Sequence, residues 1–179
     1  MRQRTFVMIK PDGVKRGLIG EIISTFERAN LQITRLEMRH PEQSVAQKHY
    51  PSTDEWFRTA GQKALRGYKE AGLDAIDDLG TNDPVAIGQT IKNRLVEFLC
   101  SGDVVIMVVE GNLAISNVRR LCGNTLPTEA DPASIRGRYS VDSPDQSFAE
   151  KRPVLNLVHA SGSRTEAEFE IGLWFSEQA

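Results

Sequence analysis

The spacing of apolar and polar residues along the chain predicts short buried strands separated by helices. Four apolar runs have the length and the bounding turns of buried strands, and they cover residues 4–10, 31–40, 103–111 and 154–161. The run at 103–111 is apolar throughout, so we expect this strand to be central or covered on both faces. In the run at 31–40 the alternation slips between Ile33 and Leu36, which indicates a bulge or a twist.

Apolar residues at helical spacing predict helices between these strands. Residues 17–30 place apolar side chains on one helical face, and Asn30 is a plausible end of that helix. From 43 to 99 the chain is predicted to be mostly helical. The best-defined helix of this region begins where Asp83 can cap and Pro84 can occupy the first helical position.

The C-terminal third combines a long polar stretch with a strand and a final helix. Residues 124–153 read as a long polar connection, which in a compact domain is usually functional or disordered. Ser163 and Glu166 have the spacing of a capping box, in which each satisfies the backbone donor of the other at the start of the last helix. The order of elements predicts an α+β sandwich with one sheet of about four strands. The pattern alone also allows a parallel sheet.

Composition and charge narrow the class of protein. The chain has 179 residues, 40% of them hydrophobic and 26% charged, which predicts a single domain over 1–179. The formal net charge of −2 gives no reason to expect a nucleic-acid partner or an anionic membrane. No apolar segment has the length of a signal peptide or a membrane span, so we expect a cytoplasmic protein. Cys100 and Cys122 read as buried free thiols.

His159 stands at the end of the fourth predicted strand, and Glu170 lies on the predicted helix that follows. If this helix folds back, the Glu170 carboxylate can accept one ring N–H and leave the other ring nitrogen with a free lone pair. That arrangement prepares a histidine to act as a nucleophile or a base. The structural alternative is a strand-end histidine bonded to backbone and a solvated glutamate, and the spacing alone does not decide between them.

Several cations could meet at this histidine. Lys10 ends the first strand, and Arg119 and Arg136 follow the third. Each is unremarkable alone, but together with Thr125 they could converge on a polyphosphate, because the planar arginine fork matches phosphate oxygens. The chain has no GxxxxGK[ST] and no GxGxxG motif, so a phosphate site would have to be built from side chains.

The motifs TFVMIKPDGVKRGLIGEI, HY, VVIMVVEG, VRRLCGNTLP, SIRG, NLVHAS and EIGLWF, in this order and over nearly the whole chain, resemble nucleoside diphosphate kinase. The resemblance implies a ferredoxin-like αβ sandwich with a four-stranded antiparallel sheet covered by helices. It also implies a homo-oligomer and a ping-pong reaction. In that reaction a nucleoside triphosphate passes its γ-phosphate to the histidine, and a nucleoside diphosphate collects it, with ATP, GTP and GDP among the substrates.

The resemblance also assigns roles to individual residues. His159 would be phosphorylated, Glu170 would orient it, Ser161 would support that carboxylate, and Tyr50 would lie beside the histidine. The residues expected to bind the nucleotide are Lys10, Phe57, Arg119, Thr125, Arg136 and Asn156, with Lys10 also counted among the catalytic residues. Phe57 would stack on the base, which suits any base because each has a π-face. Mg²⁺ would be held mainly by nucleotide phosphates and water, without protein ligands.

This chain departs from the family pattern at several positions. Insertions are expected at about 58–90, in the helical hairpin that covers the base, and at about 139–151. The first is either an inert surface extension or an element that reshapes the nucleotide entrance or an oligomer contact. Trp56 precedes Phe57, so either could stack on the base. Gly162 replaces the usual aspartate after the serine.

Three other functions fit parts of the sequence. A catalytically dormant nucleotide-binding or regulatory module of the same fold is the main alternative, although all the residues needed for the chemistry are present. An RNA-binding domain of similar topology is disfavoured because the sequence lacks an RNP-like aromatic strand and a basic excess. A histidine phosphocarrier would need a protein partner, and direct nucleotide turnover would exclude it.

Overall fold

The computed structural model describes residues 2–175, so residues 1 and 176–179 of the expected domain lie outside it. Its sheet has the strand order β2-β3-β1-β4, and every neighbouring pair is antiparallel. The four strands are β1 (Arg2–Ile9), β2 (Gln32–Arg39), β3 (Val104–Asn112) and β4 (Val158–Ala160). The antiparallel four-stranded sheet confirms the predicted α+β sandwich and excludes the parallel alternative.

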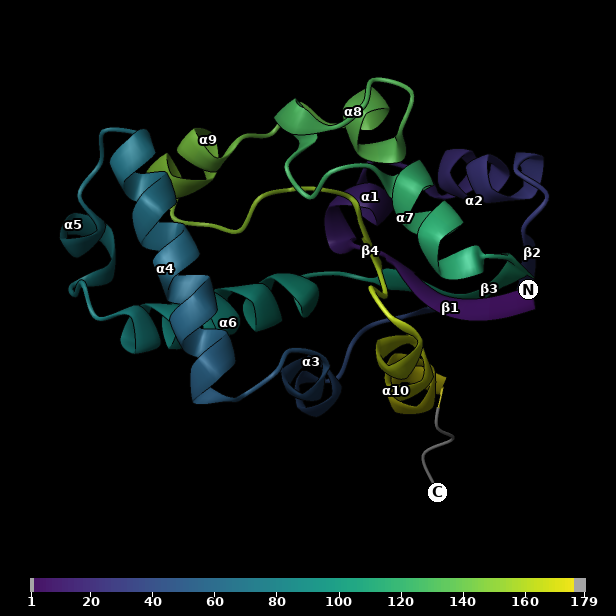
Figure 1. The fold of residues 1–179 in the computed structure, drawn as a ribbon, viewed down its shortest axis with the longest axis horizontal. Coiled ribbons are helices and arrows are strands. Elements are labelled where there is room, and N and C mark those ends of the chain that lie inside the picture. The colour runs from purple at the N-terminus through teal and green to yellow at the C-terminus, as the bar shows by residue number, and fades with distance from the viewer. Residues whose placement is uncertain (1, 176–179) are drawn as a thin grey trace.

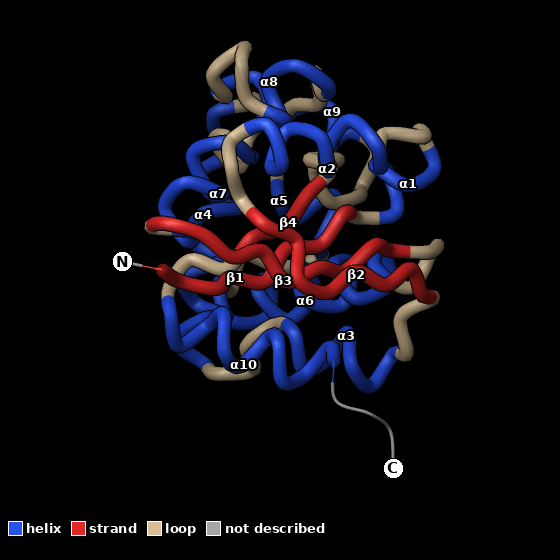
Figure 2. Tube along the Cα trace, turned by 90° about the vertical axis from the view of Figure 1, so that its right-hand side faces the viewer, coloured by secondary structure: helices blue, strands red, loops and turns tan. Residues whose placement is uncertain are grey.

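Helices cover both faces of this sheet (Figures 1 and 2). The first half of the chain contributes α1 (Pro11–Lys15), α2 (Ile19–Arg28), α3 (Gln43–His49), α4 (Asp54–Glu70), α5 (Ala75–Leu79) and α6 (Pro84–Leu99). The second half contributes α7 (Ala114–Cys122), the short 3₁₀ helix η1 (Pro127–Glu129), α8 (Ile135–Tyr139), α9 (Pro144–Ala149) and α10 (Arg164–Phe175). Among the described residues, no helix is both long enough and apolar enough to cross a bilayer.

The alternation of side chains along β1 divides the core in two. Val7 and Ile9 pack into the cluster that contains residues of α2 and α7. Phe6 and Met8 pack on the opposite face, with residues of α3, α6 and α10. Each of these four side chains is fully buried, which is worth roughly 1.5–3 kcal/mol per side chain. The period of two therefore decides which helices each residue of β1 meets.

The central and edge strands follow the predicted pattern. β3 lies between β2 and β1 and is buried over most of its length, as its continuous apolar run predicts. The register of β2 against β3 shifts between Ile33 and Arg35, so the predicted bulge is confirmed. β2 is an edge strand and leaves Leu36 and Met38 half exposed, at 50% and 57%.

Two predicted irregular segments prove to be helical. The predicted turn after β1 is the short helix α1, which places Pro11 at its first position and Asp12 in its first turn. The polar connection at 124–153 contains η1, α8 and α9 rather than a continuous loop. Ser134 and Ser143 cap α8 and α9 by accepting from backbone N–H groups. Such caps stabilise helices too short for periodicity to reveal.

The predicted strand at 154–161 is also shorter than its apolar sequence indicates, because β4 covers only Val158–Ala160. Leu157 has a φ of +68° and interrupts the extended conformation. At the start of α10 only half of the predicted capping box forms. Ser163 Oγ accepts from Glu166 N at 3.1 Å, but the Glu166 carboxylate accepts from Gly162 N at 2.7 Å.

A helical hairpin projects beyond the sheet and is formed by α4 and α6 (Figure 1). A Cβ atom at Gly61 would lie 1.9 Å from the Pro84 carbonyl oxygen, and one at Gly88 would lie 2.0 Å from that of Phe57. Only glycine permits this close approach of the two helices. Asp83 caps α6 by accepting from Ala86 N at 2.8 Å, as predicted.

The two cysteines are free thiols in different surroundings. Cys122, the last residue of α7, is buried in the core, and Cys100 is partly buried at the end of α6. Burial raises the pKa of the Cys122 thiol to about 11. This thiol is therefore protonated at neutral pH and packs as a small apolar side chain.

Candidate active site

A pocket of about 170 Å³ opens beside β4, the edge strand of the sheet. Side chains from the end of β1, from α7, from α8 and from the β4–α10 segment meet there. The residues lining it are Lys10, Arg119, Cys122, Gly123, Thr125, Arg136, Asn156, Val158, His159, Ala160 and Glu166. The end of the first strand and several segments of the last third of the chain therefore converge on the predicted strand-end histidine.

A strained turn leads into β4 and sets the position of the histidine. Leu157, with its positive φ, is the central residue of a γ-turn in which Val158 N donates to Asn156 O at 2.7 Å. Leu157 N donates to Asp12 Oδ2 at 3.0 Å, and Leu157 O accepts from Lys10 N at 2.8 Å. A positive φ at such a residue costs about 1–3 kcal/mol. The bonds from both sides hold the backbone in this conformation.

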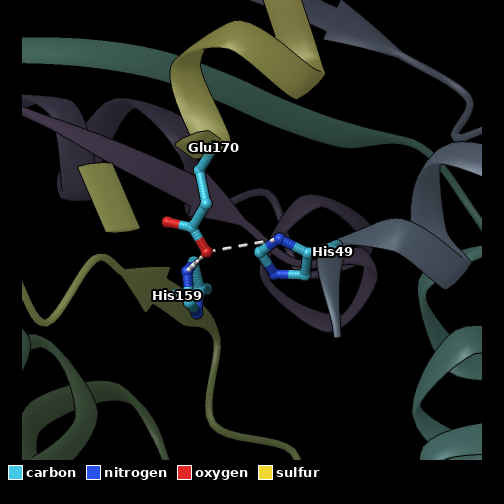
Figure 3. Close-up of side chains that lie close together, drawn as sticks. All are labelled: His49, His159 and Glu170. Atoms are coloured by element: carbon cyan, nitrogen blue, oxygen red, sulfur yellow. Dashed lines mark hydrogen bonds and ion pairs between the residues drawn. The ribbon is translucent and has the colours of Figure 1, made fainter. Parts of the chain in front are cut away.

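His159 points to the face of the sheet covered by α10. It pairs with Met8 of β1, whose side chain lies on that face. Its Nε2 atom lies 2.7 Å from Glu170 Oε1 (Figure 3), and Glu170 Oε2 accepts from Ser161 Oγ at 2.5 Å. A carboxylate beside Nε2 places the ring proton on that nitrogen and leaves the lone pair on Nδ1.

The surroundings of His159 favour the neutral ring. Burial, and then the positive charge of Lys10, lower the pKa of His159 to about 3. The side chain nevertheless keeps 22% of its surface exposed and lines the pocket. At neutral pH it is therefore an accessible, unprotonated imidazole held by a carboxylate, which is the state a nucleophilic histidine needs.

A second histidine, His49, lies behind the same carboxylate, and sequence reasoning did not assign it a role. Its Nδ1 lies 3.3 Å from Glu170 Oε1 (Figure 3) and accepts from Trp174 Nε1 at 3.3 Å. The rings of His49 and His159 meet edge to face at 4.6 Å. The side chain of His49 is only 1% exposed, and burial, then His159, lower its pKa to about 3.

His49 therefore encloses Glu170 as a neutral, buried wall. Burial raises the pKa of Glu170, while the Ser161 hydrogen bond lowers it. One sequence signal was available: His49 follows Ala46 by one helical turn, and both are buried on α3. A polar residue in line with a core alanine on a short amphipathic helix points to a buried polar contact.

Arg136 closes the edge of β4 through its guanidinium group. Its Nε donates to Asn156 O at 3.1 Å, its Nη1 to Gly123 O at 2.7 Å and its Nη2 to Val158 O at 2.7 Å. Arginine has five N–H donors, so one N–H on each terminal nitrogen remains for the pocket. Burial lowers the pKa of Arg136.

Lys10 and Asn156 form the floor of the same pocket. Lys10 Nζ donates to Asn156 Oδ1 at 2.8 Å, and Asn156 Nδ2 donates to Thr125 O at 2.9 Å. Burial, and then the charge of Arg136, lower the pKa of Lys10 to about 8, while Asp12 opposes this shift. Lys10 and Arg136 are buried cations, and with the exposed Arg119 they outnumber the one lining carboxylate, Glu166, so the pocket favours an anionic ligand.

Arg119 and Thr125 stand at the rim of the pocket. Both residues are exposed, and Arg119 Nη1 lies 3.4 Å from Ala160 O. An exposed guanidinium beside a buried one gives the pocket two planar forks at different depths. The structure thus brings together six predicted site residues along this pocket: Lys10, Arg119, Thr125, Arg136, Asn156 and His159.

Four other predicted site residues do not line the pocket. Ser161 and Glu170 lie behind His159, as described above. Tyr50 meets the His49 ring edge to face at 4.9 Å, and burial, then Glu170, raise its pKa. Phe57 is buried on α4, and the neighbouring Trp56 is partly buried. The stacking role of Phe57 or Trp56 therefore stays a prediction.

Glu166 supplies a carboxylate where Gly162 lacks a side chain. A Cβ atom at Gly162 would lie 3.0 Å from Glu166 Oε2 and 3.4 Å from Arg119 Nη1. Glu166 reaches this place from the first turn of α10 and lines the pocket. The departure from the family pattern at 162 thus leaves an acidic group at the same rim.

The oxygen atoms of the pocket fit a Mg²⁺ ion that arrives with a ligand. Among the described lining residues Glu166 is the one carboxylate, and it already accepts from Gly162 N. Mg²⁺ keeps several waters and prefers oxygen ligands, which suits a site with few protein oxygens. His49, His159 and Glu170 are close enough together to hold a metal ion, but nitrogen-rich sites suit other metals.

Comparisons with known proteins identify the family that this chain resembles. Residues 3–59 and 86–179 match the sequence model described as nucleoside diphosphate kinase. A nucleoside diphosphate kinase of Pyrobaculum aerophilum is 50% identical over 176 residues, which are 98% of this chain and 96% of that protein.

Solved structures give the same result. The crystal structure of an NDP kinase from Pyrobaculum aerophilum is similar with a TM-score of 0.95 and 48% identity, covering 99% of this chain and 98% of that one. A transition-state mimic of nucleoside-diphosphate kinase from Borrelia burgdorferi, with bound vanadate and ADP, has a TM-score of 0.75 and 33% identity. The match covers 98% of this chain and 88% of the Borrelia burgdorferi chain.

Proposed function

The chain belongs to the nucleoside diphosphate kinase family, and we propose that it transfers the γ-phosphate of a nucleoside triphosphate to a nucleoside diphosphate through His159. The observation that carries this proposal is the 2.7 Å contact between His159 Nε2 and Glu170 Oε1. It leaves Nδ1 with its lone pair on a ring that lines a cationic pocket. Both substrates are polyphosphates, which such a pocket favours.

In the first half-reaction the Nδ1 lone pair attacks the γ-phosphorus. The N–P bond forms as the bond between γ-phosphorus and the bridging oxygen breaks, and the electron pair leaves with the β-phosphate of the departing diphosphate. The ring proton stays on Nε2, where Glu170 stabilises the positive charge that the ring acquires. Because this transfer needs positioning and charge neutralisation rather than further covalent chemistry, the enclosing groups supply most of the catalysis.

In the second half-reaction a terminal oxygen of another nucleoside diphosphate attacks the same phosphorus. The N–P bond breaks, and its electron pair returns to Nδ1, so the enzyme is regenerated without loss or gain of a proton. One pocket serves both substrates in turn, which is the basis of a ping-pong mechanism. Any base is tolerated if the phosphates and the ribose carry most of the binding.

The cations of the pocket have separate tasks in this scheme. Lys10 and Asn156, bonded to each other at 2.8 Å, contact the ribose hydroxyls and the nearby phosphate. Arg119, Thr125 and Arg136 hold the remaining phosphates. Mg²⁺, bound to the phosphates and water, supplies neutralisation of the developing negative charge when present. Phe57 or Trp56 stacks on the base.

Two further properties complete the proposal. The half-exposed Leu36 and Met38 on the edge strand β2 support assembly with further copies of the chain, because an uncovered apolar edge is otherwise a liability. The protein is proposed to act in the cytoplasm as a single domain over 1–179, with its insertions at about 58–90 and 139–151. The family model leaves residues 60–85 unmatched, which supports the first of these.

Initial rates of GTP formation from ATP and GDP with Mg²⁺ test the proposal. The rate should fit parallel double-reciprocal lines as the two nucleotides are varied, because the first product leaves before the second substrate binds. Intersecting lines would exclude a free phosphoenzyme. Absence of turnover in the folded protein would instead support the catalytically dormant alternative.

A further inference from the structure

The two expected insertions pack against each other, far from each other in the sequence. Phe148 of α9 stacks on Tyr68 of α4, with ring centroids 4.1 Å apart and an angle of 27°. A Cβ atom at Gly67 would lie 2.8 Å from Phe148 Cζ, so the ring sits directly on the helix backbone. Figure 1 shows α9 lying beside the far end of α4. The second insertion is therefore attached to the hairpin.

A buried carboxylate, Asp78 of α5, strengthens this attachment. It accepts from both terminal nitrogens of Arg94 at 2.9 Å and from the hydroxyl of Tyr68. Lys151 Nζ, which follows α9, lies 3.6 Å from the same carboxylate. Asp78 thus joins α4, α6 and the second insertion at one point. Bidentate arginine pairs of this kind fix geometry as well as charge.

The other end of the second insertion is bonded to the segment that carries the active site. Asp142 accepts from Arg152 Nη1 at 2.7 Å, from Arg152 Nη2 at 2.9 Å and from Leu155 N at 2.7 Å. Ser140 Oγ donates to Leu155 O at 2.8 Å. Leu155 directly precedes Asn156, which holds Lys10 and begins the γ-turn before His159.

We propose that residues 140–155 form a strap that couples the helical hairpin to the active-site segment, and that Phe148 and Asp142 are positioning residues at its contacts with the hairpin and with Leu155. When the hairpin closes on a nucleotide, the strap transmits its position to Leu155 and so to Asn156. The strap itself does not line the pocket, so its effect is indirect. This inference rests on the proposed function, because it assigns the coupling to nucleotide binding.

The strap restricts the motion of the extended hairpin. Without this attachment, a hairpin of this length would move independently of the phosphate site. Tyr68 stacks on Phe148, and the neighbouring Ser147 O accepts from Arg152 N at 3.0 Å. Asp142 then accepts from both Arg152 and Leu155 N, so the series reaches the active-site segment and removes that freedom. Packed side chains and hydrogen bonds of this kind carry coupling between distant sites when both sites bias their arrangement.

A double-mutant cycle in the full-length protein tests the coupling. Phe148→Leu removes the stack, and Asp142→Asn weakens the anchor at Leu155. We expect each variant to raise the KM for ADP roughly three- to tenfold with kcat nearly unchanged, and the double variant to be no worse than the more affected single variant. Val141→Ala, at a side chain in the strap that is 89% exposed, is the matched control and should match wild type.

Independent effects would overturn the proposal: if the two KM changes multiply in the double variant, the contacts of Phe148 and Asp142 act separately. Unchanged KM values in both folded single variants would overturn it as well. If the wild-type protein shows no turnover, the proposed function is wrong, and hydrogen exchange then tests the strap separately.

Hydrogen exchange on the wild-type protein keeps the test decisive if a variant fails to fold. With saturating ADP and Mg²⁺, we expect slower exchange at the amides of Ser147 and Leu155, although neither residue lines the pocket. Both amides donate within the structure, Ser147 N to Ser143 O and Leu155 N to Asp142 Oδ2, so their exchange reports opening of the strap. Protection confined to residues of the pocket would contradict the coupling.

Discussion

The pocket beside β4 and the helical hairpin are held together in different ways. In the pocket, polar side chains join segments far apart in the sequence: Lys10 bonds Asn156, and Arg136 donates to three backbone carbonyls. In the hairpin, neighbouring helices pack on one another: α4 and α6 approach closely at Gly61 and Gly88, and a small apolar core and the Asp78 contacts lie beside them. The pocket is thus fixed before any ligand binds, whereas the hairpin depends on packing between two neighbouring helices.

This difference explains where the chain tolerates extra residues. An insertion that displaced Arg136 or Asn156 would break several hydrogen bonds to buried groups, each costing about 1–3 kcal/mol when left unsatisfied. The insertion expected at about 139–151 lies between these two residues and leaves their hydrogen bonds in place. An insertion at the outer end of the hairpin extends a packed surface and can build its own small core, such as the one around Tyr68 and Ile87. Changes in the pocket should therefore reduce turnover strongly, and changes in the hairpin should mainly alter nucleotide affinity.

The largest expected effect is that of removing the nucleophile. His159→Gln should lower kcat by at least about a thousandfold, because it removes the imidazole lone pair that is proposed to form the covalent intermediate. His40→Gln is the matched control, since His40 is exposed and pairs only with Asp103 on the surface. The rate of ATP–GDP exchange measures both. Substantial turnover by the His159 variant would show that His159 is not the nucleophile.

Next in size is the loss of the charge behind the histidine. Glu170→Gln keeps the shape of the side chain but removes the negative charge that stabilises the ring during transfer, so kcat should fall roughly 10²-fold. Glu168→Gln on the same helix is the control, because Glu168 makes an exposed pair with Arg4. Equal activities in these two variants would mean that Glu170 contributes packing and that its charge has no role in the transfer.

The alkaline limb of the pH profile should report Lys10. Its pKa is lowered to about 8, so the ammonium is charged below that pH and is lost as the pH rises through it. We therefore expect kcat/KM to fall about tenfold per pH unit above pH ~8. Lys10→Arg should abolish this limb, because arginine stays charged, even if the variant has a lower kcat/KM at neutral pH. A limb that persists in Lys10→Arg would belong to another group.

The smallest effect is expected in the hairpin. Phe57→Leu or Trp56→Leu should raise the KM for nucleotide about fivefold by removing a stacking surface worth roughly 1 kcal/mol, while kcat stays within about twofold. The variant with the larger KM change identifies the stacking residue. A fall in kcat as large as that of Glu170→Gln would contradict the division of roles between hairpin and pocket.

The sequence predicted the sheet and much of the site because the determining signals are local. The apolar runs Val104–Val109 and Phe6–Ile9 predict strands by themselves, and the bulge in β2 follows from a visible slip near Ile33. The resemblance to the kinase family supplied the residue roles, and family membership is confirmed. The two cationic forks from α7 and α8 reach one pocket because both close the free edge of β4.

The missed features depend on contacts between distant segments. β4 is short because Asp12 and Lys10 hold Leu157 in a γ-turn, and no periodicity in residues 154–161 encodes that. His49 gains its place only when α3 packs against α10 and its ring meets Glu170. Short capped helices such as α8 and α9 lie below the length at which an apolar stripe can be recognised.

Isolation of the phosphoenzyme tests the central claim most directly. Wild type and His159→Gln would each be incubated with γ-labelled ATP and Mg²⁺, freed of nucleotide and then chased with GDP. We expect acid-labile label on wild type, located on His159 by mass spectrometry and recovered as GTP, and no label on the variant. Label on another residue, or equal labelling of the variant, would contradict the central claim.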